Sequence, residues 1–233
     1  MGNLGDAVKK KAKDSAKDAG KKAVANALNV DVDALNGGKD TMLKNLYNSA
    51  VCYGQATLDI STALNLDDGK RAALQTAMNN LKNNKSDFGS IQQVVDASAI
   101  DSKSVTEAAN ELLNSEDKDK IERANVLIKK SKAERQAANM YKLLATKDAA
   151  SLIKNSTKAL GSGKKDLGDK AKVVMELLNT AKSAKQITGA IGSNHKMMSS
   201  ALKTYEKKTG MADKISDDDA LSQINKDGLG IME

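Results

Sequence analysis

No proline occurs anywhere in the 233 residues of this chain. Proline interrupts an α-helix because it lacks a backbone N–H and its ring clashes with the preceding turn, so nothing of that kind limits helix length here. Strand-rich domains rely on aromatic residues, which make up only 2% of this chain. Alanine, leucine, lysine, aspartate and asparagine dominate instead, and the first three are strong helix formers. The composition therefore predicts an all-α fold.

The hydrophobic residues are spaced as amphipathic helices require. They make up 40% of the chain, and they recur three and four positions apart over most of its length. The competing interpretation is disorder, because 29% of the residues are charged and the mean hydropathy is negative. A helical period gives each segment an apolar face to bury, and it therefore favours a folded chain.

Two long helices are predicted in the second half of the chain, over residues 116–160 and 167–205. Gly161, Ser162 and Gly163 separate them, so we expect an antiparallel hairpin whose helices are each roughly 60 Å long. The second helix carries a mostly apolar seam whose steps alternate three and four, as in a coiled coil. Its members are Val174, Leu177, Ala181, Ala184, Thr188, Ile191, His195, Met198, Leu202 and Tyr205.

An earlier helix is expected after a break in the first part of the chain. Asn36, Gly37 and Gly38 form this predicted break, because two adjacent glycines weaken a helix. Asp40 follows them and is the expected N-cap of a helix that runs to about residue 65.

Shorter helices are expected to pack along the hairpin. The turn at residues 67–69 leads to a helix that ends near Leu81, and another short helix is expected after Phe88. Ser104 and Glu107 have the spacing of a capping box, in which each side chain accepts a hydrogen bond from the other residue's backbone N–H. The predicted fold is an elongated helix bundle built on a long antiparallel helical hairpin, with shorter helices packed along it.

Three parts of different character are expected. Residues 1–38 form a weakly packed N-terminal amphipathic helix or tether, because the apolar line of that segment is mostly alanine and buries little area. Residues 39–210 form a single helical-bundle domain. Residues 211–233, with three consecutive aspartates and a glycine-containing end, form a peripheral C-terminal tail with at best one short helix.

The formal net charge of +7 raises the question of nucleic-acid binding. Only Arg71, Arg123 and Arg135 are arginines, and arginine supplies the fork that grips phosphate and reads guanine. The lysines are interleaved with Asp and Glu, as on a solvated helix face. A protein or cell-envelope partner is therefore expected, and nucleic acid is not.

The residues that usually carry catalysis are scarce. His195 is the only histidine, which excludes a classical catalytic triad and a multi-histidine metal site. With Met198 one turn away, His195 has the spacing of a haem or copper ligand pair, but the same spacing fits two members of a core seam. Cys52 lies in an apolar stretch and is expected to be a buried free thiol. We expect no catalytic residue, metal or cofactor.

Small residues gather in the middle of the last long helix. They let a neighbouring helix approach closely or leave room for a ligand, and the glycines also allow a bend. The candidate ligand-binding residues are Tyr53, Ala181, Thr188, Gly189, Gly192 and His195.

The first residues, Met1 to Asp6, resemble the mature beginning of bacterial lipoproteins just after the lipidated cysteine. This resemblance implies a lipid anchor at the native N-terminus and a place in the cell envelope, in the periplasm or at the outer membrane. A native cytoplasmic start is the alternative. No apolar run approaches the ~20 residues that span a bilayer.

The leading functional hypothesis is a non-enzymatic, envelope-associated helical bundle that acts as a structural or interaction module. One alternative is a carrier of a small apolar ligand bound between helices. Another is a helical, toxin-like protein whose hairpin opens to expose an apolar face to a membrane.

Overall fold

The computed structural model describes residues 31–85, 87–115, 117–161 and 168–232. Within these ranges every regular element is an α-helix, seven in all and numbered α2 to α8. The predicted all-α fold is confirmed, and so is its architecture of a long antiparallel hairpin with shorter helices packed along it. The predictions for residues 1–30 lie outside the described residues.

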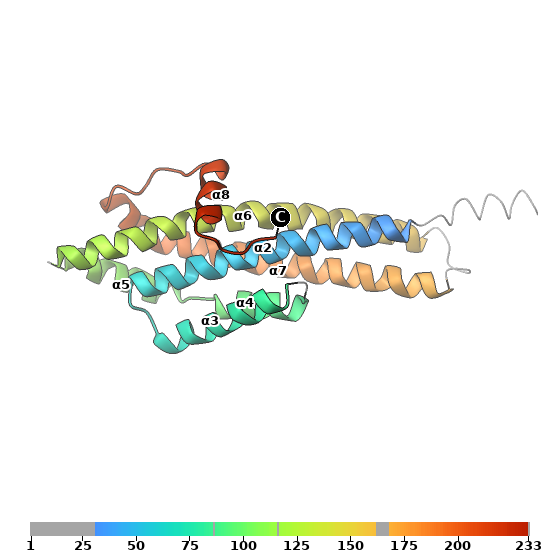
Figure 1. Cartoon of the computed structure of the whole chain (residues 1–233), viewed down its shortest axis with the longest axis horizontal. Helices are drawn as coiled ribbons and strands as arrows, with labels where there is room; N and C mark the ends of the chain where they lie inside the picture. The colour runs from blue at the N-terminus through green and yellow to red at the C-terminus, as the bar shows by residue number, and fades with distance from the viewer. Residues whose placement is uncertain (1–30, 86, 116, 162–167, 233) are drawn as a thin grey trace, which may run out of the picture.

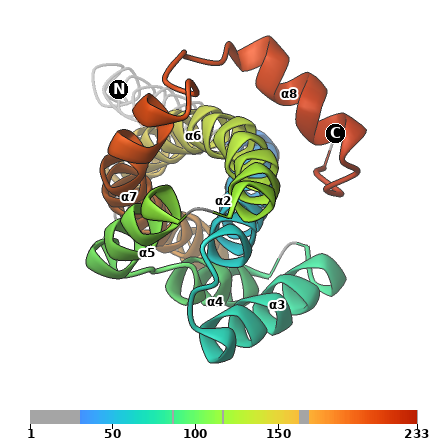
Figure 2. The ribbon, with the colours of Figure 1, turned by 90° about the vertical axis from the view of Figure 1, so that its left-hand side faces the viewer.

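Three long helices form the rod of the molecule. They are α2 (Val32–Ala63), α6 (Lys118–Gly161) and α7 (Gly168–Lys208), and they lie side by side along the longest axis (Figure 1). The helices α6 and α7 form the predicted hairpin. An end-on view shows α2 beside both of them, so that the three helices surround a common core (Figure 2).

Four shorter helices cover one half of this rod. They are α3 (Asp68–Asn83), α4 (Phe88–Ala97), α5 (Ser102–Asn114) and α8 (Asp217–Lys226). The helices α3 and α4 pack against each other and both contact α2, α5 packs on α7, and α8 packs on α6 from the opposite side (Figures 1 and 2). Among the described residues, the other half of the rod consists of the three long helices alone (Figure 1).

The core follows the predicted seam of α7. Every member of that seam is buried except His195, which is half-buried. The helix α2 contributes several of the largest buried side chains, among them Tyr47 and Tyr53, and α6 contributes mostly alanines. Small side chains on α6 allow α2 to approach it closely, and the aromatic rings of α2 fill the remaining space.

The start of α2 corrects the prediction of a break at Asn36 to Gly38. The helix begins at Val32, and Asp31, not Asp40, is its N-cap, with a carboxylate oxygen that accepts a hydrogen bond from the Ala34 N–H at 2.9 Å. Leu35 is buried in the core, so the burial of this apolar residue holds the helix through its two glycines. The predicted boundary at residue 38 therefore falls inside α2.

The start of α5 also differs from its prediction. The predicted capping box is wrong, because Asp101 caps the helix three residues before Ser104. Its carboxylate accepts hydrogen bonds from the Ser104 N–H at 3.0 Å and from the Ser104 hydroxyl at 2.8 Å. An aspartate is as good an N-cap as a serine. Here Asp101 is the cap, and Ser104 lies inside the first turn of the helix.

The C-terminal segment is anchored on the rod through α8 and the residues after it. Ala220, Ile224 and Leu229 are buried. The amide of Asn48 on α2 donates to the Met232 carbonyl at 2.9 Å and accepts from the Met232 N–H at 2.7 Å. The end of the chain thus lies against the middle of α2.

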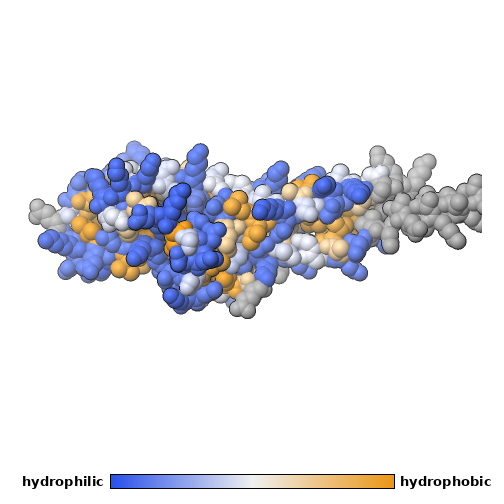
Figure 3. All heavy atoms as spheres, turned by 90° about the horizontal axis from the view of Figure 1, so that it is seen from above, coloured by the Kyte–Doolittle hydropathy of each residue, from blue (hydrophilic) through white to orange (hydrophobic). Residues whose placement is uncertain are grey.

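On the face shown in Figure 3, hydrophilic side chains alternate with apolar patches. The exposed large apolar side chains include Leu143 and Leu144 on α6 and Met175 on α7. No helix within the described ranges is long and apolar enough to cross a membrane.

Candidate functional site

Of the residues predicted to form a ligand site, three lie in the core and two lie outside it. Tyr53, Ala181 and Thr188 are buried in the core. Gly189 is exposed, with nothing within 4 Å of the position that a Cβ would take, and the corresponding position at Gly192 is 3.5 Å from the Lys142 Nζ. The two glycines therefore face outward from the seam.

His195 is the predicted site residue that lines a hollow. Its neighbour in the seam, Met198, is buried in the core. Within the described residues, no group of three or more His, Cys, Asp or Glu side chains is arranged to hold a metal ion. Haem or copper ligation by His195 and Met198 stays the alternative that the sequence analysis set aside.

The hollow beside His195 is a cleft of about 480 Å³. Its walls come from α6, from α7 and from the loop of residues 209–216 between α7 and α8. We call it the α6–α7 cleft. It is lined by Lys132, Arg135, Gln136, His195, Ser199, Glu206, Ala212, Lys214 and Ile215.

Arg135 forms one wall of this cleft and is only 4% exposed. Its Nη1 donates a hydrogen bond to the Ser199 hydroxyl at 3.0 Å, and its Nη2 pairs with a Glu206 carboxylate oxygen at 2.5 Å. A buried guanidinium is costly unless it is paired, and these two contacts hold it across the α6–α7 interface. Its Nε has no hydrogen-bond partner.

Side chains of α6 hold the loop of residues 209–216, which forms one wall of the cleft. The Lys132 ammonium donates to the backbone carbonyls of Met211 and Asp213. The Gln136 amide donates to an Asp217 carboxylate oxygen at 2.6 Å. These bonds hold the loop over the cleft without placing a carboxylate against Lys132.

His195 is electrically neutral in this setting. Burial, together with the nearby positive charges of Arg135 and Lys142, lowers the pKa of His195 to about 4. Its Nδ1 is buried without a hydrogen-bond partner. The buried Nδ1 is not exposed to the cleft, so this atom is not a contact for a molecule there.

A second buried polar cluster lies on the other side of α6. The Lys130 Nζ is 3.2 Å from a carboxylate oxygen of Asp59, 3.5 Å from one of Glu134 and 4.0 Å from one of Asp227. These residues come from α2, from α6 and from the end of α8, so the cluster ties the three elements together. Burial, with help from the charge of Asp59, raises the pKa of Glu134 to about 8.

Cys52 lies close to this second cluster. It is fully buried on α2, as predicted. Burial, and then the charge of Glu134, raises the pKa of the Cys52 thiol. A thiol with a raised pKa is a poor nucleophile, so the described surroundings of Cys52 favour a packing role.

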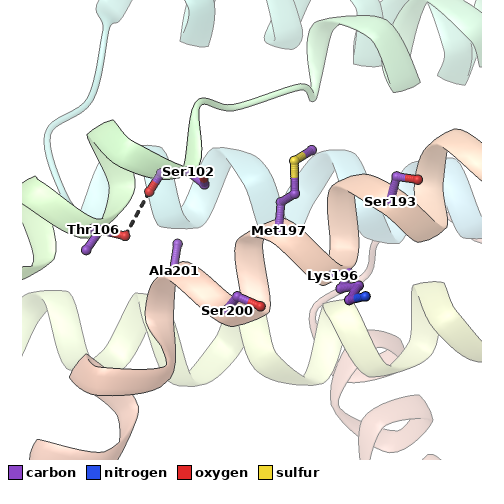
Figure 4. A pocket seen from close by; sticks show the side chains of 7 residues that line it. All are labelled: Ser102, Thr106, Ser193, Lys196, Met197, Ser200 and Ala201. Atoms are coloured by element: carbon purple, nitrogen blue, oxygen red, sulfur yellow. Dashed lines mark hydrogen bonds between the residues drawn. The ribbon is translucent and has the colours of Figure 1, made fainter.

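A shallower groove of about 540 Å³ runs between α5 and α7 (Figure 4). Hydroxyl side chains dominate its lining, and Thr106 uses its hydroxyl to donate to the Ser102 carbonyl at 2.8 Å. Its charged lining residue is Lys196. The full lining is Ser102, Thr106, Ser193, Lys196, Met197, Ser200 and Ala201.

The α6–α7 cleft is therefore the best-formed candidate site among the described residues. It combines a buried arginine, two lysines, a neutral imidazole and a hydroxyl. Sequence reasoning named His195 but missed Arg135 and Glu206. The available signal was that Glu134 and Arg135 lie next to the apolar stripe of α6, where a charge needs a partner.

Comparisons of the chain with protein-family models, with curated proteins and with solved structures returned no match.

Proposed function

We propose that the chain is a non-enzymatic, envelope-associated helical bundle that acts as a structural or interaction module in a bacterial cell. The chain would display an elongated surface to a protein or to another envelope component. A lipid anchor at the native N-terminus would tether it.

The rod is the observation that carries this proposal. Its three long helices contain 32, 44 and 41 residues. At 1.5 Å per residue the longest spans about 66 Å, well beyond the part that the short helices cover (Figure 1). A long, stiff bundle that extends beyond the short helices of its described part has the form expected of a spacer or a display module.

The use of polar groups in the interior supports the same proposal. Arg135 is paired with Glu206, Lys130 with Asp59, and the Tyr205 hydroxyl donates to the Asn125 side chain at 2.8 Å. Each contact joins two different segments of the bundle. Groups that are engaged in this way stabilise one arrangement of helices, as a rigid module needs.

Cell fractionation tests the proposal. An antibody against the chain is used to follow the native protein in cells of the source bacterium, with a cytoplasmic enzyme as the marker of leakage. We expect the chain in the envelope fraction, released by detergent and not by 1 M salt if it is lipid-anchored. Recovery with the cytoplasmic marker would contradict the proposal.

The two alternatives stay predictions with tests of their own. An apolar-ligand carrier would co-purify with a ligand, although none of the hollows described above is lined by Tyr53, Ala181 or Thr188. A membrane-opening protein would cause dye leakage from liposomes, which a display module would not.

A further inference from the structure

We infer that the α6–α7 cleft binds a small, free anion that carries a phosphate or carboxylate group. This inference concerns a site separate from the display surface, and it stands whether or not the chain is associated with the envelope.

The first argument is charge. Lys132, Arg135 and Lys214 bring three formal positive charges to the lining, and Glu206 brings one negative charge. Glu206 is committed to Arg135. Lys132 is held by two backbone carbonyls, which leave its charge uncompensated. Asp217 accepts a hydrogen bond from the lining residue Gln136 and brings a second negative charge beside the recess. The group keeps a formal excess of one positive charge, which attracts an anion, and its low-dielectric walls strengthen that attraction.

The second argument is the set of donors. Arg135 is buried and already oriented by Ser199 and Glu206, so its fork loses little freedom when it meets an anion. Its Nε and the His195 Nδ1 are both buried without partners. Because these two atoms are buried beneath the cleft lining, an anion in the cleft acts on Arg135 and His195 through its charge.

The third argument is size and shape. The cleft of about 480 Å³ lies within the range of small-molecule sites. Ala212 and Ile215 line it as well, on the loop, and provide an apolar surface for the carbon part of a ligand. A macromolecule would need a larger, more open surface, so the occupant is a free small molecule.

His195 provides the measurement, because it is the only histidine in the chain. Its imidazole signals are followed by NMR in the full-length protein while inorganic phosphate or citrate is added at pH 6.5. The groups that face His195 are Arg135 and Lys142 from α6 and the charged lining residues of the cleft. A bound anion opposes these positive charges, so we expect saturable shifts with at least one probe and a rise in the pKa of His195.

Two lysine variants distinguish the site from diffuse attraction. Lys214→Gln removes a charge from the lining, and Lys203→Gln removes the same charge from an exposed position on α7 outside it. Both side chains are exposed, so both variants should fold. We expect Lys214→Gln to weaken binding about five- to tenfold, as loss of one charged contact does, and Lys203→Gln to weaken it less than twofold.

Three results would overturn the inference. The first is unchanged His195 signals with both probes. The second is equal weakening by the two lysine variants, which would indicate attraction to the overall positive charge. The third is binding only to vesicles of phosphatidylglycerol, with no response to free phosphate or citrate, because the cleft would then not hold a free anion.

Discussion

Glu134 and Arg135 are adjacent on α6 and both are buried, and they point about 100° apart around the helix, toward different neighbours. Glu134 faces Lys130 and the charge of Asp59, whereas Arg135 reaches Ser199 and Glu206 on α7. The two residues therefore belong to different polar clusters. Each cluster joins α6 to a different neighbour.

Glu134 should make stability depend on pH. Burial raises the pKa of its carboxyl to about 8 in the folded chain, so the folded state keeps a proton that the unfolded state has lost. The free energy of unfolding should fall between pH 5 and pH 8, and Glu134→Gln should remove this fall. The difference in free energy of unfolding between the original protein and Glu134→Gln should change by about 2–4 kcal/mol from pH 5 to pH 8. Urea denaturation measures it. A difference that does not vary with pH would contradict the assignment.

Arg135 should matter far more to stability than a surface arginine. Replacing Arg135 with alanine leaves Glu206 without its partner inside the bundle, and should cost about 3–5 kcal/mol. Arg71→Ala is the matched control, because Arg71 pairs with the exposed Asp68 and should cost less than about 1 kcal/mol. Chemical denaturation measures both. Equal losses would mean that the Arg135 pair is no more than a surface contact.

For single residues, the sequence predicts which side chains are buried better than it predicts which other side chains they contact. It predicts the buried positions of α7 and the buried Cys52, because a helical period assigns each residue to a face. It cannot predict that Arg135 meets Ser199 and Glu206, which lie 64 and 71 positions later. That contact depends on the register of two helices, which no local pattern contains.

Gly37 and Gly38 lie inside α2, although two adjacent glycines are expected to weaken a helix. Gly37 and Gly38 have open space where a Cβ would lie, so replacement of each by alanine should stabilise the fold by about 0.5–1 kcal/mol. Gly54 is the control, because its Cβ would clash with the Met78 sulfur and lie 3.0 Å from a Val94 methyl carbon. Gly54→Ala should destabilise by about 1–3 kcal/mol. Thermal melting checks all three, and stabilisation at Gly54 would contradict this packing.

The C-terminal segment depends on Asn48. Both hydrogen bonds between Asn48 and Met232 join buried or half-buried groups, so Asn48→Ala should cost about 1–3 kcal/mol. Hydrogen exchange should show the loss most directly at the Met232 amide. Ser49→Ala is a neighbouring control, because Ser49 donates to Ala138 on α6 and not to the C-terminal segment. Unchanged protection of Met232 in Asn48→Ala would show that other contacts hold the segment.

Element boundaries were predicted less well than elements. The two hairpin helices were predicted within a few residues at each end, since their stripes are long and regular. The start of α2 was misplaced because the burial of Leu35 outweighs the weakness of two glycines. The cap of α5 was misplaced because two good capping residues, Asp101 and Ser104, lie three positions apart.

At the scale of the whole molecule, one hairpin organises the rest. The helix α2 packs along much of the hairpin, and the four short helices cover one half of the rod (Figure 1). The sequence predicts the hairpin from its seam. It does not predict that α8 crosses to the face opposite α3 and α4, because the short helices have apolar faces that fit several positions on the rod.

The α6–α7 cleft is a consequence of this arrangement. Residues of α6 and α7 form its floor, and the loop that leads to α8 forms its outer wall. The register of the hairpin decides which residues of α6 and α7 meet there. A different register would separate Arg135 from Ser199, and with it would remove the site. The central claim is therefore the long, antiparallel hairpin in this register.

Double electron–electron resonance tests that claim most directly. Spin labels are placed on exposed cysteines at Lys129 and Lys203 in one variant and at Lys129 and Glu176 in another, while the buried Cys52 stays unlabelled. We expect the first pair to lie within about 20 Å and the second to be separated by about 40 Å or more, because Lys203 and Glu176 are 27 residues apart on α7. Similar distances in the two variants, or a shorter distance to Glu176, would contradict the hairpin.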